Sequence, residues 1–140
     1  MTAGLLRSPV AEAVGKRVLL ACVAGNHHAV GLRMVADAFQ LAGWDVRYLG
    51  ANVPGASIVQ FAAEWRADLL GLSASFAQHL RTVRETITLL RDTMGASRPA
   101  VMVGGLAINR FDRLADMVGA DAWSSDARAA VARAGELVGA

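Results

Sequence analysis

Short apolar runs alternate along this chain with longer segments whose apolar residues recur every three or four positions. The run Val18–Val23 is apolar throughout, which is typical of a strand covered on both faces of a sheet. The segment 30–42 that follows has the spacing of an amphipathic helix, and Gly43 stands where such a helix ends. Chains that repeat this alternation fold as a parallel sheet between layers of helices.

The alternation continues to the end of the chain and predicts five strand–helix units. The predicted strands are 18–23, 45–49, 68–73, 99–103 and 120–123, and the predicted helices are 30–42, 54–66, 80–94, 109–118 and 125–138, the last capped by Ser125. Right-handed crossovers restrict the order of such units in a sheet. We therefore predict an α/β fold, a flavodoxin-like (Rossmann-type) five-stranded parallel sheet of order 2-1-3-4-5 with helices on both faces.

The length of 140 residues suits one domain with a hydrophobic core. Residues 1–15 are rich in small residues and lack periodicity, so we expect a flexible leader before a single domain over 16–140. The only cysteine, Cys22, excludes an internal disulfide and a cysteine-based zinc site. Its place in the first apolar run predicts a buried, inert thiol.

Charge and hydropathy narrow the classes of partner. The formal net charge is +2 and no run of Lys or Arg occurs, so we expect no direct contact with nucleic acid. No apolar stretch approaches the roughly 20 residues of a membrane span. The apolar run before Cys22 is too short for an export signal, so we expect a cytoplasmic protein.

Small and polar residues follow the first, third and fourth predicted strands. In parallel sheets of this order, ligands bind where the strands end, at the switch point between the first and third strands. The residues at these ends are Gly25, Asn26, His27, His28 and Gly31 after the first strand, Ser73, Ala74 and Ser75 after the third, and Gly104 and Gly105 after the fourth. Small residues let a ligand approach the backbone, and a neutral imidazole is a good metal ligand.

Each feature has an ordinary explanation when taken alone. A histidine between a strand and a helix is often a cap or a solvated loop residue, and we expect that role for His79. The chain has no Gly-x-x-x-x-Gly-Lys phosphate loop, and no Gly-x-Gly-x-x-Gly follows the first strand. A mononucleotide or dinucleotide site of those kinds is therefore not predicted.

The three strand ends together resemble the cobalamin (vitamin B12)-binding domain family, whose motifs are Asp-x-His-x-x-Gly, Ser-x-Leu and Gly-Gly. The matching residues are Asn26, His28, Gly31, Ser73, Gly104 and Gly105. The resemblance implies base-off/His-on binding, with His28 as the cobalt ligand in place of the cofactor's own base. It also implies that the freed nucleotide tail enters a cavity beside the first strand, lined by Ser73 and the two glycines. The expected cofactor contacts are Asn26, His27, His28, Gly31, Ser73, Ser75, Gly104, Gly105 and Trp123.

Two residues depart from the family pattern. Asn26 replaces the carboxylate that accepts a hydrogen bond from the ligating histidine, so we expect a weaker cobalt–histidine bond. Ser75 replaces the Leu of Ser-x-Leu, which makes the expected tail cavity more polar. Adenosyl-, methyl- and hydroxocobalamin all remain open as the bound form, and haem bound through His28 is an alternative.

Two functional readings follow from the resemblance. The segment 44–54 is similar to the cobalamin domains of transcriptional photoreceptors, which favours a sensor that acts through protein contacts, with light as one signal. The alternative is the corrinoid-carrying small subunit of a mutase or methyltransferase. The loops hold no paired carboxylates and no nucleophile–base pair, so we expect no catalytic residues in this chain itself. With about sixteen residues before the first strand, we expect a regulator, an enzyme large subunit or a second copy to cover the upper corrin face.

Overall fold

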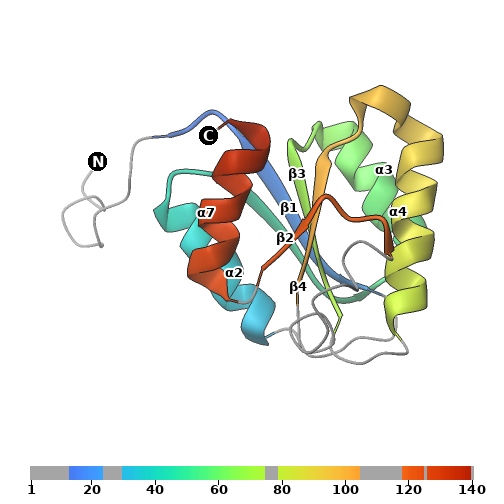
Figure 1. Cartoon of the computed structure of the whole chain (residues 1–140), viewed down its shortest axis with the longest axis horizontal. Coiled ribbons are helices and arrows are strands. Elements are labelled where there is room, and N and C mark those ends of the chain that lie inside the picture. Colours follow the sequence, from blue (N-terminus) through green and yellow to red (C-terminus); the bar gives the residue numbers. More distant parts are fainter. Residues whose placement is uncertain (1–12, 24–29, 75–78, 105–117, 125, 140) are drawn as a thin grey trace.

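A computed structural model of the chain describes residues 13–23, 30–74, 79–104, 118–124 and 126–139 (Figure 1). Its elements are β1 (Arg17–Val23), α2 (Val30–Leu41), β2 (Asp45–Val53), α3 (Gly55–Trp65), β3 (Leu69–Ser73), α4 (Leu80–Met94), the 3-10 turn η2 (Gly95–Ser97), β4 (Ala100–Gly104), β5 (Ala122–Trp123) and α7 (Ala127–Val138). The five strands form one sheet in the order β2-β1-β3-β4-β5, and every neighbouring pair is parallel. The predicted fold class and strand order are confirmed.

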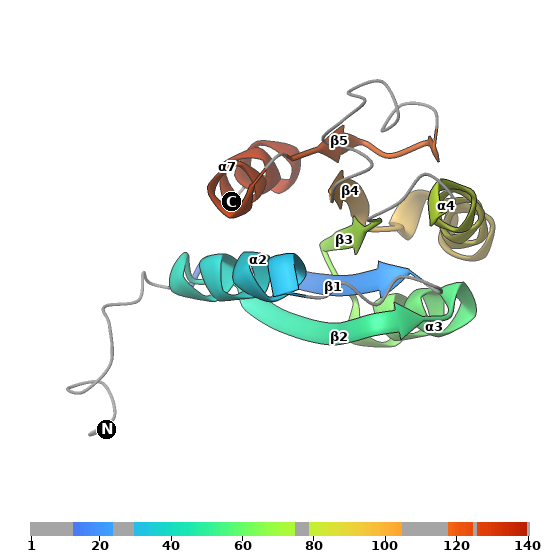
Figure 2. The same cartoon turned by 90° about the horizontal axis from the view of Figure 1, so that it is seen from below.

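The helices cover the sheet in two pairs, α2 with α7 on one face and α3 with α4 on the other (Figure 2). The two central strands are the most buried, as their apolar runs predict: in β1 every residue after Arg17 is buried, and all of β3 is. Alternate residues therefore supply two separate cores. Leu19, Val23, Leu70 and Leu72 pack under α3 and α4.

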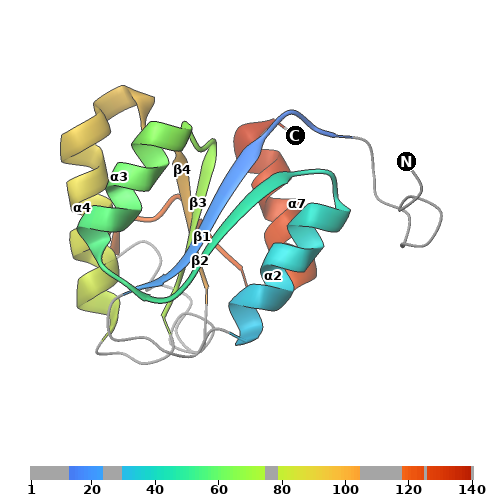
Figure 3. The same ribbon diagram turned by 180° about the vertical axis from the view of Figure 1, so that it is seen from behind.

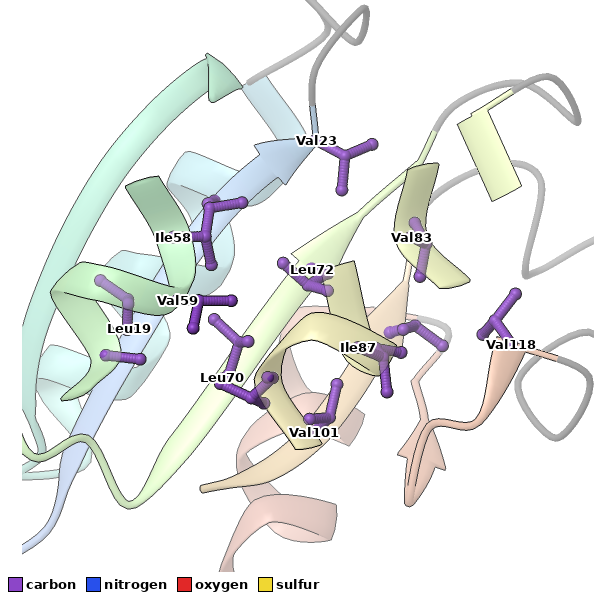
Figure 4. Packing of buried hydrophobic residues seen from close by; sticks show 14 of the residues in the cluster. Leu19, Val23, Ile58, Val59, Leu70, Leu72, Val83, Ile87, Val101 and Val118 are labelled. Atoms are coloured by element: carbon purple, nitrogen blue, oxygen red, sulfur yellow. The ribbon is translucent and has the colours of Figure 1, made fainter. Parts of the chain in front are cut away.

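The core beneath α3 and α4 is built from branched aliphatic side chains (Figure 4). Ile58 and Val59 of α3 and Val83 and Ile87 of α4 point onto the sheet in this close-up. The two helices approach closely at Gly55, where an added β-carbon would lie 2.7 Å from Oγ1 of Thr86. A side chain at position 55 would therefore push α3 away from α4.

The second strand is longer than the sequence predicts. β2 lies beside β1 at the edge of the sheet and continues to Val53, whereas the prediction ended at Leu49 (Figure 3). Gly50 and Asn52 have positive φ angles of 87° and 55°, and the register with β1 shifts twice here. Irregular pairing with β1 accommodates both residues, so the strand continues past Gly50.

The cap of the last helix lies one residue later than predicted. Asp126 is its cap, and the Asp126 carboxylate accepts a hydrogen bond from the Ala129 amide at 2.8 Å. Ser125 was predicted as the cap, and Asp126 takes this role because its Oδ1 reaches the third amide of the helix. The predicted leader at 1–12 and most of the predicted helix over 109–118 lie outside the described residues.

Candidate functional site

Three strands end side by side at one edge of the sheet, the lower edge in Figure 1. In the parallel register, Cys22 of β1 pairs with Ser73 of β3, and Ser73 pairs with Gly104 of β4. Register partners point to the same face of a sheet. Cys22 belongs to the core beneath α2 and α7, so all three residues face that side. We call Cys22, Ser73 and Gly104 the small-residue row.

A hydrogen bond links two members of this row. The Cys22 side chain is fully buried and Ser73 is 9% exposed. Burial raises the pKa of the Cys22 thiol, and a hydrogen bond from the Ser73 hydroxyl partly opposes that rise. Cys22 is therefore a neutral thiol that accepts a hydrogen bond from the neighbouring Ser73 hydroxyl.

The helices above the row also carry small side chains. Ala36 of α2 and Ala130 and Ala134 of α7 are buried in the same core as Cys22. α2 and α7 pack against each other across this face. Larger side chains share this core, among them Leu32 and Phe39 of α2, so the small residues form only part of the surface beneath the two helices.

Packing is tighter at Gly71, two residues before Ser73 in β3. A β-carbon added at Gly71 would lie 2.5 Å from Cδ2 of Leu20, inside contact distance. At Gly104, which is in the small-residue row, the nearest described atom to an added β-carbon is the Ser124 carbonyl oxygen at 3.4 Å. Among the described residues, an added β-carbon would therefore clash at Gly71 and make only an ordinary contact at Gly104.

Two further candidates lie apart from the row. Trp123 pairs with Val103, a member of the core beneath α3 and α4, so Trp123 faces the opposite side from Ser73. The structure therefore does not bring Trp123 together with the row. His79 was expected to be solvated, but it is only 5% exposed at the start of α4, so that prediction is wrong.

The remaining predicted contacts are placed only in part. The backbone of Gly31 lies in the first turn of α2, directly after β1. Asn26, His27, His28, Ser75 and Gly105 lie outside the described residues. The expected cobalt ligand and its hydrogen-bond partner therefore stay predictions from the sequence.

A family model described as "B12 binding domain" matches residues 16–132 of this chain. The chain belongs to the B12-binding domain family. The predicted resemblance is thereby confirmed, and cobalamin, named from the three strand ends, is the cofactor class of that family. Haem is not supported as an alternative.

Three similar proteins illustrate the range of the family. Dimethylamine corrinoid protein 2 of Methanosarcina mazei is 38% identical over 116 residues, which cover 83% of this chain and 53% of that protein. The HTH-type transcriptional repressor CarA of Myxococcus xanthus is 38% identical over 93 residues, covering 66% of this chain and 31% of the repressor. The crystal structure of a cobalamin-binding protein from Desulfitobacterium hafniense superposes with a TM-score of 0.82 at 28% identity, covering 88% of this chain and 59% of that one.

The chain spans about half the length of the dimethylamine corrinoid protein that it matches. Among the described residues, no helix combines the length and apolar character that a membrane span requires.

The described residues fit a corrinoid with an extended nucleotide tail. Such a tail needs a floor without bulky side chains and polar groups to meet its own polar atoms. The small-residue row supplies both, since it contains a glycine, a hydroxyl and a thiol at neighbouring strand ends. Sequence analysis identified Ser73 and Gly104 at these strand ends, and its prediction that the Cys22 thiol is buried is confirmed.

Proposed function

We propose that this chain is a corrinoid-carrying protein of a methyltransferase system. The observation that carries the proposal is its 38% identity, over 83% of its length, with a dimethylamine corrinoid protein. The fit of the small-residue row to a nucleotide tail supports the cofactor, and the match to a methyl-transfer protein supports the role. The sensor interpretation, which the sequence alone favoured, is supported by a shorter match, 93 residues of CarA against 116 residues of the corrinoid protein.

A bound corrinoid supplies a cobalt centre that accepts and releases a methyl group. The chain's own residues would bind and orient it. His28 would hold the metal, and the side-chain oxygen of Asn26 would accept a hydrogen bond from the N–H of the other ring nitrogen and so orient the imidazole. Ser73 and Gly104, with Ser75, Gly105, Gly31 and His27 nearby in sequence, would hold the tail.

Methyl transfer also needs a group that activates the methyl donor, and this role falls to another protein. Neither Cys22 nor His79 is placed to act as an exposed nucleophile or base, because both are buried. We therefore propose that a methyltransferase subunit docks at the carboxyl edge of the sheet and covers the upper corrin face. A second copy of this chain is the other candidate for that cover.

Absorption spectra with methyl-, adenosyl- and hydroxocobalamin test the proposal. Each sample is measured in the dark and after illumination, and each is passed through a gel-filtration column. A carrier is expected to bind methyl- and hydroxocobalamin in the base-off/His-on form and to keep the same size in light and dark. Failure to bind any of the three forms would overturn the proposal.

A light-sensitive regulator is the second candidate, favoured by the 38% identity to CarA over 93 residues. Its expected result in the same experiment differs, because a photosensor changes its protein contacts when the upper ligand is lost. A change of size on illumination of the adenosylcobalamin complex would select this function over the carrier.

A further inference from the structure

The small-residue row contains one group that the proposed function leaves without a role, the thiol of Cys22. It lies in register with Ser73 on the adjacent strand, and both side chains face the helices α2 and α7. The two central strands contain no charged side chain at this level, so the thiol and the hydroxyl are the polar groups of the floor there.

Burial makes the geometry of this pair well defined. Cys22 is 0% exposed and Ser73 is 9% exposed, and the hydrogen bond between them restricts rotation of the hydroxyl. A serine side chain without such a partner can point in three staggered directions. The thiol therefore selects the direction in which Ser73 presents its oxygen to anything bound above the row.

We propose that Cys22 is a positioning residue for tail recognition, whose thiol orients the Ser73 hydroxyl so that the site prefers corrinoids with a complete nucleotide tail over tail-less ones. The proposal rests on the proposed binding of a corrinoid. It assigns to Cys22 a share of the affinity for the nucleotide tail and none of the affinity for the corrin ring. Gly104, the register partner of Ser73 on β4, places no side chain beside that hydroxyl.

The test compares dissociation constants for cobalamin and for cobinamide, a corrinoid that lacks the nucleotide tail. In the Cys22→Ala variant, affinity for cobalamin is expected to fall about three- to tenfold, the range of one hydrogen bond, while affinity for cobinamide stays unchanged. Cys22→Ser keeps a hydrogen-bonding group and is expected to restore most of the preference. Val23→Ala is the matched control, since Val23 is equally buried in β1 but faces the opposite core.

The outcomes separate the two proposals. If the wild-type chain binds neither corrinoid, the proposed function fails. If it binds both, but Cys22→Ala weakens both equally or neither, the role of Cys22 is refuted while the function stands. Thermal unfolding of each variant shows that it is folded before its binding is compared.

Thiol labelling gives a second readout on the unaltered protein. Because Cys22 is the only cysteine, a thiol reagent such as dithionitrobenzoate reports on this position alone. Because Cys22 is buried, the reagent reaches it only when the structure opens locally. The two ligands are therefore compared at equal multiples of their dissociation constants, and cobalamin is expected to slow labelling more than cobinamide does. Equal protection by the two ligands would show that the thiol does not lie beside the tail.

Discussion

The carboxylate of Asp121 and the guanidinium of Arg98 form a two-pronged ion pair, with N–O distances of 3.0 and 3.1 Å. The same carboxylate accepts the amide of Val101 at 2.8 Å. Asp121 therefore ties the start of the two-residue strand β5 to β4, the neighbour that ends in Gly104. We call these contacts of Asp121 with Arg98 and Val101 the clamp. A two-residue strand needs them because it forms few backbone hydrogen bonds with its neighbour.

The clamp predicts acid-sensitive stability. Partial burial raises the pKa of Asp121, but hydrogen bonds from Arg98 and Val101 and the charges of Arg98 and Arg91 outweigh it, so the pKa lies below its ordinary value. A group with a lowered folded-state pKa stabilises the fold above its unfolded pKa of about 4, and this contribution disappears as pH falls through the folded pKa. Asp121→Asn is expected to lower the free energy of unfolding by about 1–3 kcal/mol at neutral pH and to weaken its decline in acid.

Urea denaturation at neutral pH and below about pH 4 measures both effects. Glu136→Gln is the matched control, since Glu136 forms a more exposed pair with Arg133 at 2.9 Å. That change is expected to cost less than about 0.5 kcal/mol. Equal losses in the two variants would contradict a special role for Asp121.

Close packing at Gly71 predicts a penalty for the smallest possible addition. Leu20 is 1% exposed, so its Cδ2, 2.5 Å from the added β-carbon, has little room to move. Gly71→Ala is expected to reduce the free energy of unfolding by about 1–3 kcal/mol. In a Leu20→Ala background the clash is removed, so the two losses measured by chemical denaturation should sum to more than that of the double variant. Strict additivity would contradict the clash.

The fold was predictable because a strand that is buried on both faces is apolar along most of its length. Val18–Val23 is an uninterrupted apolar run, and residues 69–72 contain only leucine and glycine; these segments form β1 and β3, which are neighbours inside the sheet. The edge strand β2 was predicted too short, and only its pairing with β1 shows that the strand continues through positive φ angles at Gly50 and Asn52. Local sequence does not contain that information.

The site was predictable as a set of strand ends and not as a set of contacts. Ser73 and Gly104 were identified because each follows an apolar run, and parallel pairing brings such ends together. The hydrogen bond of Cys22 and the side on which Trp123 lies both depend on the register of neighbouring strands. A register shift of one residue would separate Cys22 from Ser73 and move Trp123 to the other face of the sheet, so neither feature could be predicted from the sequence.

Gly104 offers a direct test of the tail position. Gly104→Ala adds a β-carbon 3.4 Å from the Ser124 carbonyl oxygen, which the fold can accommodate with a small adjustment. Gly104→Val adds two more methyl groups on the side facing α2 and α7. We expect the valine variant to lose at least about tenfold in cobalamin affinity, equivalent to roughly 1.4 kcal/mol, with the alanine variant intermediate. Titration followed by absorption measures the two constants, and unchanged affinity in Gly104→Val would place the tail elsewhere.

The two neighbouring histidines are expected to differ sharply. His28 matches the cobalt-ligating position of the family motif, and His27 falls on a variable one. His28→Ala is expected to weaken cobalamin binding and to shift the absorption spectrum towards the base-off form without histidine. His27→Ala is the matched control and should leave the spectrum unchanged. Equal effects of the two substitutions would contradict the assignment of His28.

Asn26 is the departure from the family motif with the clearest chemical consequence. A carboxylate that accepts the second ring N–H of a metal-bound imidazole increases electron donation to the metal, and an amide oxygen does so less. Asn26→Asp is therefore expected to preserve or strengthen the binding of hydroxocobalamin, whereas Asn26→Ala, which removes the acceptor, should weaken it. Spectral titration of the three proteins orders their affinities. A loss of binding in Asn26→Asp would show that the amide N–H group of Asn26, which aspartate lacks, is the part that the site requires.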